Sequence, residues 1–317
     1  MLVLKLSSSS KGYLLVALSG VFYGMSGLFV ESLSAFHIPT SVMGFFRPFI
    51  AFIVFFLFLL IKKRSYLKID PKGLASIALI GFTSQALFNR LYFTTIQRTT
   101  IATAVVLLYT APIFVVILAR ILYKEPLNPP KISALIVSVV GCFLTATGGS
   151  LEVLRLNGAG LLFGLGSGFI FALTPLLNKS LVKRYHYWTI ACYTMGFGSL
   201  FTLITIDPRE IFLIDYNLKI LSNLTALALL ANALASLLYV MGMSKDIQSS
   251  KASIINTVEV PVAVLISFIF FRENILGLKL IGILLVILSV VILEYGEQVV
   301  QSLKSKTKEG LVNHRIP

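Results

Sequence analysis

The sequence predicts an all-α integral membrane protein in which ten transmembrane helices form two inverted repeats of five helices. The first observation behind this prediction is composition, because the 317 residues are 57% hydrophobic and only 13% charged. Their mean hydropathy of +0.91 exceeds what the surface of a soluble protein tolerates. The other two observations are a series of long apolar runs and an internal repeat that relates the two halves of the chain.

The apolar runs define the expected helices. About 20 residues of α-helix cross a hydrocarbon core of about 30 Å, and ten runs of about this length occur. In the first half they cover residues 12–33, 39–61, 74–96, 101–123 and 131–149. In the second half they cover residues 158–178, 187–206, 222–243, 252–271 and 277–294. The predicted repeats are therefore residues 1–150 and 151–297, and residues 298–317 form a basic tail.

Basic residues gather on one side of the predicted membrane. If the N-terminus is cytoplasmic, 19 of the 27 Lys and Arg residues fall on the cytoplasmic side and six on the opposite side. The positive-inside rule therefore predicts a cell-membrane protein with both termini in the cytoplasm. The net charge of +14 follows from this arrangement, so it does not indicate a nucleic-acid partner.

Two proline-centred segments show the internal repeat most clearly. LLYTAPIFVVILARILYKEPL surrounds Pro112, TVEVPVAVLISFIFFRENIL surrounds Pro261, and each ends in a basic residue followed by glutamate. The two prolines lie 149 positions apart, which is close to half the chain. A proline inside an apolar helix removes a backbone hydrogen bond, so we expect both residues to kink their helices.

The third and eighth predicted spans carry the same polar stripe. Gln85, Asn89 and Tyr92 are spaced at i, i+4 and i+7, which places them on one helical face. An offset of 147 positions carries this stripe onto the eighth span, where the counterparts are Asn232, Ser236 and Tyr239. We expect both stripes to face one cavity; the alternative is hydrogen bonding between helices.

The number of spans in each repeat determines their relative orientation. Five is odd, so the second repeat enters the membrane from the opposite side. Inverted repeats are typical of secondary transporters, because two similar halves can expose a site near the membrane midplane to either side. Duplication alone also fits a channel.

Several segments together carry a family resemblance. They are the proline-centred helices ending in KEPL or RENI, the turns LYFTTIQRTTIATA and LYVMGMSKDIQSSKAS, the glycine-containing spans ISALIVSVVGCFL and LIGILLVILSVVI, and GFFRPFIAF. Over nearly its whole length, the chain resembles the EamA-type members of the drug/metabolite transporter superfamily. The resemblance implies an all-helical carrier with a central cavity between the halves, which moves small metabolites, amino acids or drugs across the cell membrane, often outward.

Glu259 is the clearest candidate site residue. A charge at the centre of a bilayer costs about 3 kcal/mol or more, so a buried carboxylate there usually faces a cavity or a partner. Asn256 and Ser253 precede Glu259 at steps of three on the same face. We expect Glu259 to bind a substrate ammonium group or to couple transport to protons; the alternative is a structural ion pair with Arg47 or Arg90.

Other polar residues inside the spans are weaker candidates. Arg90 lies beside the polar stripe and could hold a substrate carboxylate, or it could reach the outer surface. Arg47 precedes Pro48, and a structural role is favoured for it. Tyr109 lies shortly before Pro112, next to Thr110, which is the counterpart of Glu259.

The sequence argues against several other functions. The three histidines lie at span ends or in the tail, and no zinc cluster, catalytic triad or Walker glycine loop occurs, so no metal, cofactor or enzymatic activity is expected. The favoured function is a secondary transporter of a small polar metabolite such as an amino acid. We expect it to export or exchange this metabolite by alternating access. The alternatives are an exporter of drugs or organic cations, or a channel or scaffold. Expected partners are the substrate and the lipid bilayer, and a second copy of the chain is a further candidate.

Overall fold

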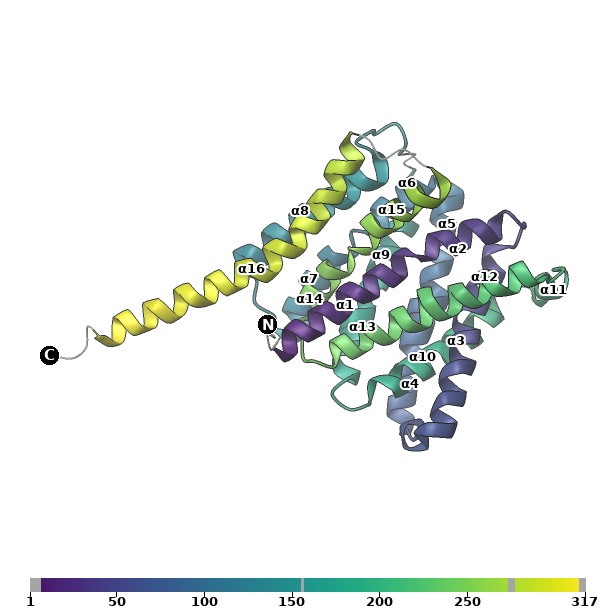
Figure 1. The fold of residues 1–317 in the computed structure, drawn as a ribbon, viewed down its shortest axis with the longest axis horizontal. Helices are drawn as coiled ribbons and strands as arrows, with labels where there is room; N and C mark the ends of the chain where they lie inside the picture. Colours follow the sequence, from purple (N-terminus) through teal and green to yellow (C-terminus); the bar gives the residue numbers. More distant parts are fainter. Residues whose placement is uncertain (1–6, 155–156, 273–276, 314–317) are drawn as a thin grey trace, which may run out of the picture.

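The computed structural model describes residues 7–154, 157–272 and 277–313 (Figure 1). Within these ranges every regular element is helical and no strand occurs, which confirms the all-α prediction. Helices of the two halves are interleaved, because α1 (Ser8–Gly24) packs along α13 (Ala235–Met243) and α5 (Phe88–Arg98) packs along α9 (Gly158–Leu181). The two repeats therefore share one bundle.

The remaining elements of the first half follow the expected order. They are α2 (Ser26–Ser34), α3 (Thr40–Lys62), a 3-10 turn (Arg64–Leu67), α4 (Pro71–Gly81), a π-helical turn η2 (Phe82–Leu87), α6 (Ile101–Leu108), α7 (Ala111–Tyr123) and α8 (Pro129–Thr147). Those of the second half are α10 (Tyr187–Thr205), α11 (Pro208–Phe212), α12 (Leu218–Ala228), a π-helical turn η3 (Leu229–Leu234), α14 (Ser249–Asn256), α15 (Glu259–Phe271) and α16 (Leu278–Asn313).

Nine segments of the described chain are helices long and apolar enough to cross a membrane. They agree with nine of the ten expected spans. The expected span at 74–96 is helical from Pro71 to Arg98 but is not among the nine. This segment carries Lys72 and Arg90 as well as the polar stripe, so its composition is less apolar. That it crosses the membrane stays a prediction.

Each repeated proline segment is interrupted by a two-residue turn shortly before the proline, where the sequence predicted a kink. The fourth span is divided between α6 and α7 at Tyr109, and the ninth between α14 and α15 at Thr257. Pro112 and Pro261 each lie in the first turn of the helix that follows the break. The missing N–H of proline costs nothing there, because the first N–H groups of a helix have no partner within it.

Further backbone features repeat between the halves. The turns η2 and η3 lie 147 positions apart, which is the offset that relates the polar stripes. Lys124 and Arg272, the basic residues that end α7 and α15, both have left-handed backbones with φ of 53° and 56°. The duplicated sequence thus specifies the same π-turn and the same helix end twice.

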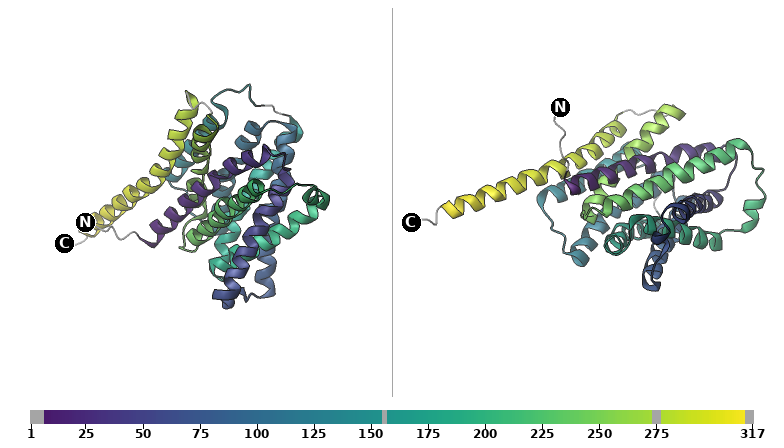
Figure 2. Two further views of the ribbon diagram at one scale, coloured as in Figure 1. Left: turned by 45° about the vertical axis from the view of Figure 1, so that its right-hand side comes forward. Right: turned by 60° about the horizontal axis from the view of Figure 1, so that its bottom comes forward.

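The bundle has two ends with different loops. Tyr185 Oη donates to Asp70 at one end, which also holds the loops after α7 and α13 and is called the Glu125 end. Ser41 Oγ donates to Glu210 at the other, which is called the Asp207 end. Both views in Figure 2 show α16 beginning at the edge of the bundle and extending beyond it. This helix packs along α8, where Gly141 of α8 lies against Val286 of α16.

Candidate functional site

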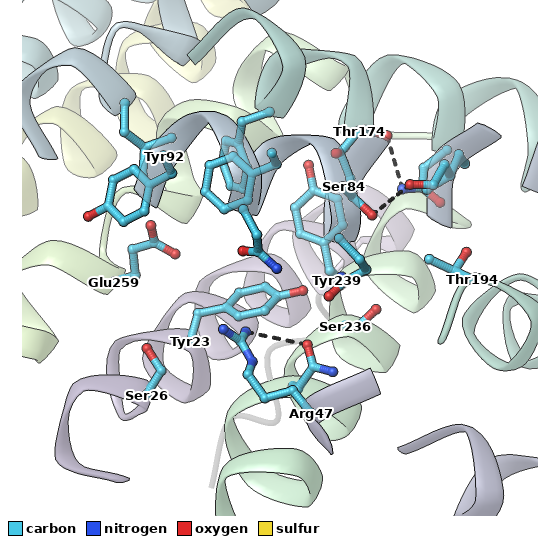
Figure 3. Close-up of a pocket in the computed structure, with 18 of the residues that line it drawn as sticks. Tyr23, Ser26, Arg47, Ser84, Tyr92, Thr174, Thr194, Ser236, Tyr239 and Glu259 are labelled. Atoms are coloured by element: carbon cyan, nitrogen blue, oxygen red, sulfur yellow. Dashed lines mark hydrogen bonds between the residues drawn. The ribbon is translucent and has the colours of Figure 1, made fainter. Parts of the chain in front are cut away.

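A central cavity of about 250 Å³ lies where the broken helices and the π-helical turns meet (Figure 3). Nine of the predicted site residues line this cavity, although they come from several different predicted spans. They are Arg47, Gln85, Asn89, Tyr92, Tyr109, Asn232, Ser236, Tyr239 and Glu259. Both polar stripes therefore face one cavity, and the π-turns carry Gln85 and Asn232 into its wall. A π-turn shifts the register of a helix and occurs often at functional sites.

Glu259 is the first residue of α15 and receives two hydrogen bonds. Tyr109 Oη donates to Oε1 at 2.7 Å, which joins the two helix breaks across the cavity. Asn256 Nδ2 donates to Oε2 at 3.3 Å. Within the described ranges, the ion pairs involve Glu125 and not Glu259. The expected alternative, a structural ion pair of Glu259 with Arg47 or Arg90, is therefore not formed.

Arg47 projects from α3 into the same cavity. Its Nη2 donates to Asn232 Oδ1 at 3.4 Å, while its Nε is buried and has no hydrogen-bond partner. The guanidinium of Arg47, whose Nε is an unused donor, faces the same space as the Glu259 carboxylate. The cavity thus offers one carboxyl group and one guanidinium group that form no direct ion pair with each other.

Arg90 does not line the central cavity. It is exposed and lines a separate cavity of about 420 Å³ toward the Asp207 end, together with Asp207 and Glu210. Asn89 lines the central cavity although its neighbour Arg90 does not, because successive residues of a helix point about 100° apart around the axis. Asn89 lines both cavities, so they adjoin there. The structure therefore places Arg47, and not Arg90, on the wall of the central cavity with Glu259.

A smaller side pocket of about 50 Å³ continues from the central cavity toward the Glu125 end. Pro112 and Asn256 line it, and Tyr109 and Glu259 line both spaces. Asn256 is 7% exposed, and its Oδ1 has no hydrogen-bond partner. Pro261 lines neither of these pockets and is buried, so its contribution is to the start of α15.

Sequence reasoning missed part of the wall. The missed polar residues of the central cavity are Tyr23, Ser26, Ser84, Thr174, Asn178 and Thr194. Thr174 and Asn178 are spaced i, i+4 within an apolar run, the signal that identified the stripes on the third and eighth spans. Tyr23 and Ser26 flank the division between α1 and α2, for which the sequence has no proline signal.

Buried polar atoms without hydrogen-bond partners concentrate around these two pockets. In the described part of the chain six such atoms occur, and one of them is Ser19 Oγ, outside the pockets. The other five are Arg47 Nε, Thr174 Oγ1, Asn178 Oδ1, Thr194 Oγ1 and Asn256 Oδ1. Most buried polar groups in proteins are satisfied, so a concentration of unsatisfied groups indicates a place for a polar ligand or water.

A profile of the EamA-like transporter family matches residues 10–147 and again residues 158–295. The chain belongs to the EamA-like transporter family. The family unit occurs twice in this EamA-family protein, and the resemblance seen in the sequence is confirmed.

Curated relatives carry transporter names. An uncharacterized transporter of Archaeoglobus fulgidus is 27% identical over 277 residues, 87% of this chain and 94% of the relative. The uncharacterized inner membrane transporter YicL of Salmonella typhimurium is 23% identical over 292 residues, 91% and 96% of the two chains. The uncharacterized transporter YyaM of Bacillus subtilis is 25% identical over 252 residues, 78% and 80% of the two chains.

A solved crystal structure shares the fold. It superposes with a TM-score of 0.76 at 15% identity, over 89% of this chain and 96% of the other. The family, the transporter names of the relatives and the apolar helices together identify this EamA-family protein as a multi-pass membrane transporter.

Proposed function

We propose that the protein is a secondary carrier of a small zwitterionic metabolite such as an amino acid. The observation that carries this proposal is the central cavity with Glu259 and Arg47 on its wall and no ion pair between them. A substrate with one ammonium and one carboxylate group would satisfy both charges. The five unsatisfied polar atoms around the central cavity and the side pocket support a polar substrate.

The two charged groups suit the two ends of such a substrate. Each Glu259 oxygen accepts one hydrogen bond and can accept more, so the carboxylate can receive an ammonium group. The aromatic rings of Tyr23, Tyr109 and Tyr239 line both pockets near it and can contact a cation through their faces. Arg47 can hold a carboxylate through its planar fork of donors.

The mechanism that we propose is alternating access between two inverted five-helix repeats. Support comes from the paired breaks, the paired π-turns and the double family match, because similar halves can exchange their conformations. The central cavity adjoins the polar cavity at the Asp207 end through Asn89. The net direction that we favour is export or exchange at the cell membrane.

The topology that we propose places both termini and the Glu125 end in the cytoplasm. Loops at this end carry Lys62, Lys63, Arg64 and Lys183, in agreement with the positive-inside rule. A cysteine introduced in the 208–218 loop should react with an impermeant thiol reagent applied to intact cells, whereas one at position 66 should not. The reverse labelling pattern would invert the proposed topology.

Counterflow in proteoliposomes tests the carrier function. Vesicles are loaded with an unlabelled mixture of neutral amino acids, and entry of the same amino acids with a radioactive label is followed. A carrier drives transient uptake above the equilibrium level, which neither a channel nor a scaffold can do. Equilibration without overshoot would indicate a channel, and no entry of any amino acid would refute the proposed substrate class.

Competition by substrate fragments distinguishes the zwitterion from the organic-cation alternative. Phenethylamine lacks the carboxylate of phenylalanine and 3-phenylpropionate lacks its amine. We expect phenylalanine to inhibit counterflow best, with the advantage over phenethylamine lost in Arg47→Gln. Equal inhibition by phenylalanine and phenethylamine in the unmodified protein would favour an exporter of organic cations.

A further inference from the structure

Glu125 occupies a buried position at the end of the bundle nearest the side pocket. It follows Lys124, whose left-handed backbone ends α7 and turns the chain toward the second half. The side chain is only 4% exposed although it is ionisable. A buried carboxylate needs charged or hydrogen-bonding partners to offset its lost hydration.

Those partners belong to the other half of the chain. Lys179 Nζ of α9 donates to Glu125 Oε1 at 2.7 Å. The backbone N–H groups of Ser249 and Ser250, the first two residues of α14, donate to the carboxylate at 2.8 and 3.2 Å. Ser250 Oγ is a further donor to Oε2. One carboxylate thus joins α7 of the first repeat to two helices of the second.

The N-terminus of α14 depends on this distant carboxylate. Gln248 precedes the helix and makes no capping hydrogen bond with its side chain. At the equivalent helix α6, Thr100 caps the N-terminus locally by accepting from Thr103 N. Free N–H groups and the helix dipole favour an anion at the start of a helix. Glu125 therefore supplies to α14 the cap that α6 obtains from its own neighbour.

The contacts of Glu125 with Lys179, Ser249 and Ser250 are called the junction, and a second buried charge adds to it. Lys131 of α8 is fully buried, and its Nζ lies 4.0 Å from Glu125 Oε2. This Nζ also donates to Pro126 O at 2.7 Å and to Gln248 Oε1 at 2.6 Å. The contact to Gln248 is another link between the halves. Separation of the halves at this end would have to break these charge-assisted bonds together.

The junction closes one route to the substrate cavity. All eight residues of α14 are buried, and the side pocket reaches Ser253, one turn inside the helix start. Ser249 Oγ also donates to Pro175 O of α9 at 3.4 Å, and Pro175 lines the side pocket. At the opposite end the polar cavity with Arg90 adjoins the central cavity. The structure is therefore closed at the Glu125 end.

We propose that Glu125, Lys179 and the first two residues of α14 form a latch that holds this end of the carrier closed. The latch must open whenever the cavity is exposed to the Glu125 end, so it sets the balance between the two access states. This proposal rests on the alternating-access mechanism proposed above. It does not depend on the identity of the substrate.

Cysteine accessibility tests the latch without any substrate. The two native cysteines, Cys142 and Cys192, are buried and free. Both are first replaced by alanine, and each reporter cysteine is introduced into this cysteine-free protein. One reporter is Ser253→Cys in the side pocket, and the other is Thr94→Cys in the polar cavity at the Asp207 end. An impermeant thiol reagent is applied separately to inside-out and right-side-out vesicles.

Glu125→Gln should move the two reporters in opposite directions. Loss of a charge-assisted bond corresponds to about tenfold or more in an equilibrium constant, so labelling of Ser253→Cys from the Glu125 end should accelerate about tenfold. Labelling of Thr94→Cys from the other side should slow, because fewer molecules remain open there. Lys179→Met should have a smaller effect, since the bonds to Ser249 and Ser250 remain.

A matched control distinguishes the effect of losing the latch from the effect of losing any charge near Glu125. Arg120 donates only to the main-chain carbonyl of Glu125, at 3.4 Å, and Arg120→Gln should leave both labelling rates unchanged. Faster labelling of both reporters in Glu125→Gln would mean general loosening of the fold and would overturn the latch, as would unchanged labelling of both. Opposite changes would establish the latch even if counterflow with amino acids failed.

Discussion

The two proline-centred spans have the same backbone but different surroundings and side chains. Both are broken one or two residues before the helix that carries the proline, and both end in a left-handed basic residue. In the second half, α14 is buried along its whole length and begins at the Glu125 carboxylate. In the first half, α6 is partly exposed, with Ile101 66% exposed, and has a local cap.

The side chains at the two breaks also differ in whether their hydrogen bonds are local or reach the other half of the chain. Thr110 Oγ1 donates to Leu107 O of its own span at 2.6 Å, so its polarity is satisfied locally. Its counterpart Glu259 is satisfied only in part, by Tyr109 of the other half and by Asn256. The interrupted proline helix therefore occurs in both repeats, whereas the carboxyl group of Glu259 occurs only in the second. We infer that the symmetry serves the conformational change and the asymmetry serves binding.

The largest expected effect comes from removing the charge at the second break. Glu259→Gln should reduce counterflow about 100-fold, because loss of a carboxylate that pairs with a ligand charge inside a cavity costs several kcal/mol. Thr110→Val at the equivalent break should stay within about twofold, since its hydroxyl bonds only to its own helix. The measurement is counterflow at equal amounts of inserted protein. Normal counterflow by Glu259→Gln would show that the carboxyl group at the second break is not needed for transport.

The hydrogen bond that joins the two breaks should have the next largest effect. Tyr109→Phe removes the donor to Glu259 Oε1 and should reduce counterflow about tenfold, the usual range for a bond to a charged group. Tyr193→Phe is a matched control, because its hydroxyl donates to Leu67 O outside the cavity. Equal loss in both variants would show that Tyr109 acts through stability alone.

Close packing beside Glu259 gives a prediction on stability. A Cβ added at Gly24 would lie 2.7 Å from Glu259 O and 2.8 Å from Val262 Cβ, whereas one at Gly27 meets nothing within 4 Å. Gly24→Ala should cost about 1–3 kcal/mol of unfolding free energy. Gly27→Ala should be neutral or stabilise by up to about 1 kcal/mol. Thermal unfolding in detergent measures both, and an unchanged Tm for Gly24→Ala would contradict the tight contact.

The smallest expected effect is the pH dependence of the Glu125 latch. Burial alone would raise the pKa of Glu125, but hydrogen bonds from Lys179 and Ser250 hold this pKa below its ordinary value. Lys131 also faces the carboxylate, and Tyr123 lies near it. Since the folded pKa is the lower one, stability from this group is full above the unfolded pKa of about 4.3 and is lost as pH falls through the folded pKa.

Thermal unfolding against pH measures this contribution. The Tm difference between the unmodified protein and Glu125→Gln should be constant from pH 8 to pH 6 and should shrink below about pH 4.3. Asp207→Asn, at the opposite end of the bundle, serves as the control. A difference that persists unchanged at pH 3 would show that the charge of Glu125 does not stabilise the fold.

Much of the site could be predicted because it repeats in the sequence. The stripe Gln85, Asn89 and Tyr92 and its counterparts were recognised from helical spacing and from a common offset, and all six residues line the cavity. Tyr23 was not recognised, although Ser19, Tyr23 and Ser26 have the same i, i+4 and i+7 spacing as the stripe. That Arg47 lines the central cavity and Arg90 does not depends on which side of its helix each residue occupies, and only packing determines that.

The sequence by itself determined the membrane class, the duplication and the residues that could carry charge into the bilayer. These properties follow from composition and from local periodicity, which do not depend on contacts between distant residues. Only the tertiary structure decided that the proline helices are broken, that Glu259 meets Tyr109, and that Glu125 caps α14. The contacts of Glu259 with Tyr109 and of Glu125 with α14 each join residues more than 100 positions apart, and only the packed bundle brings such residues together.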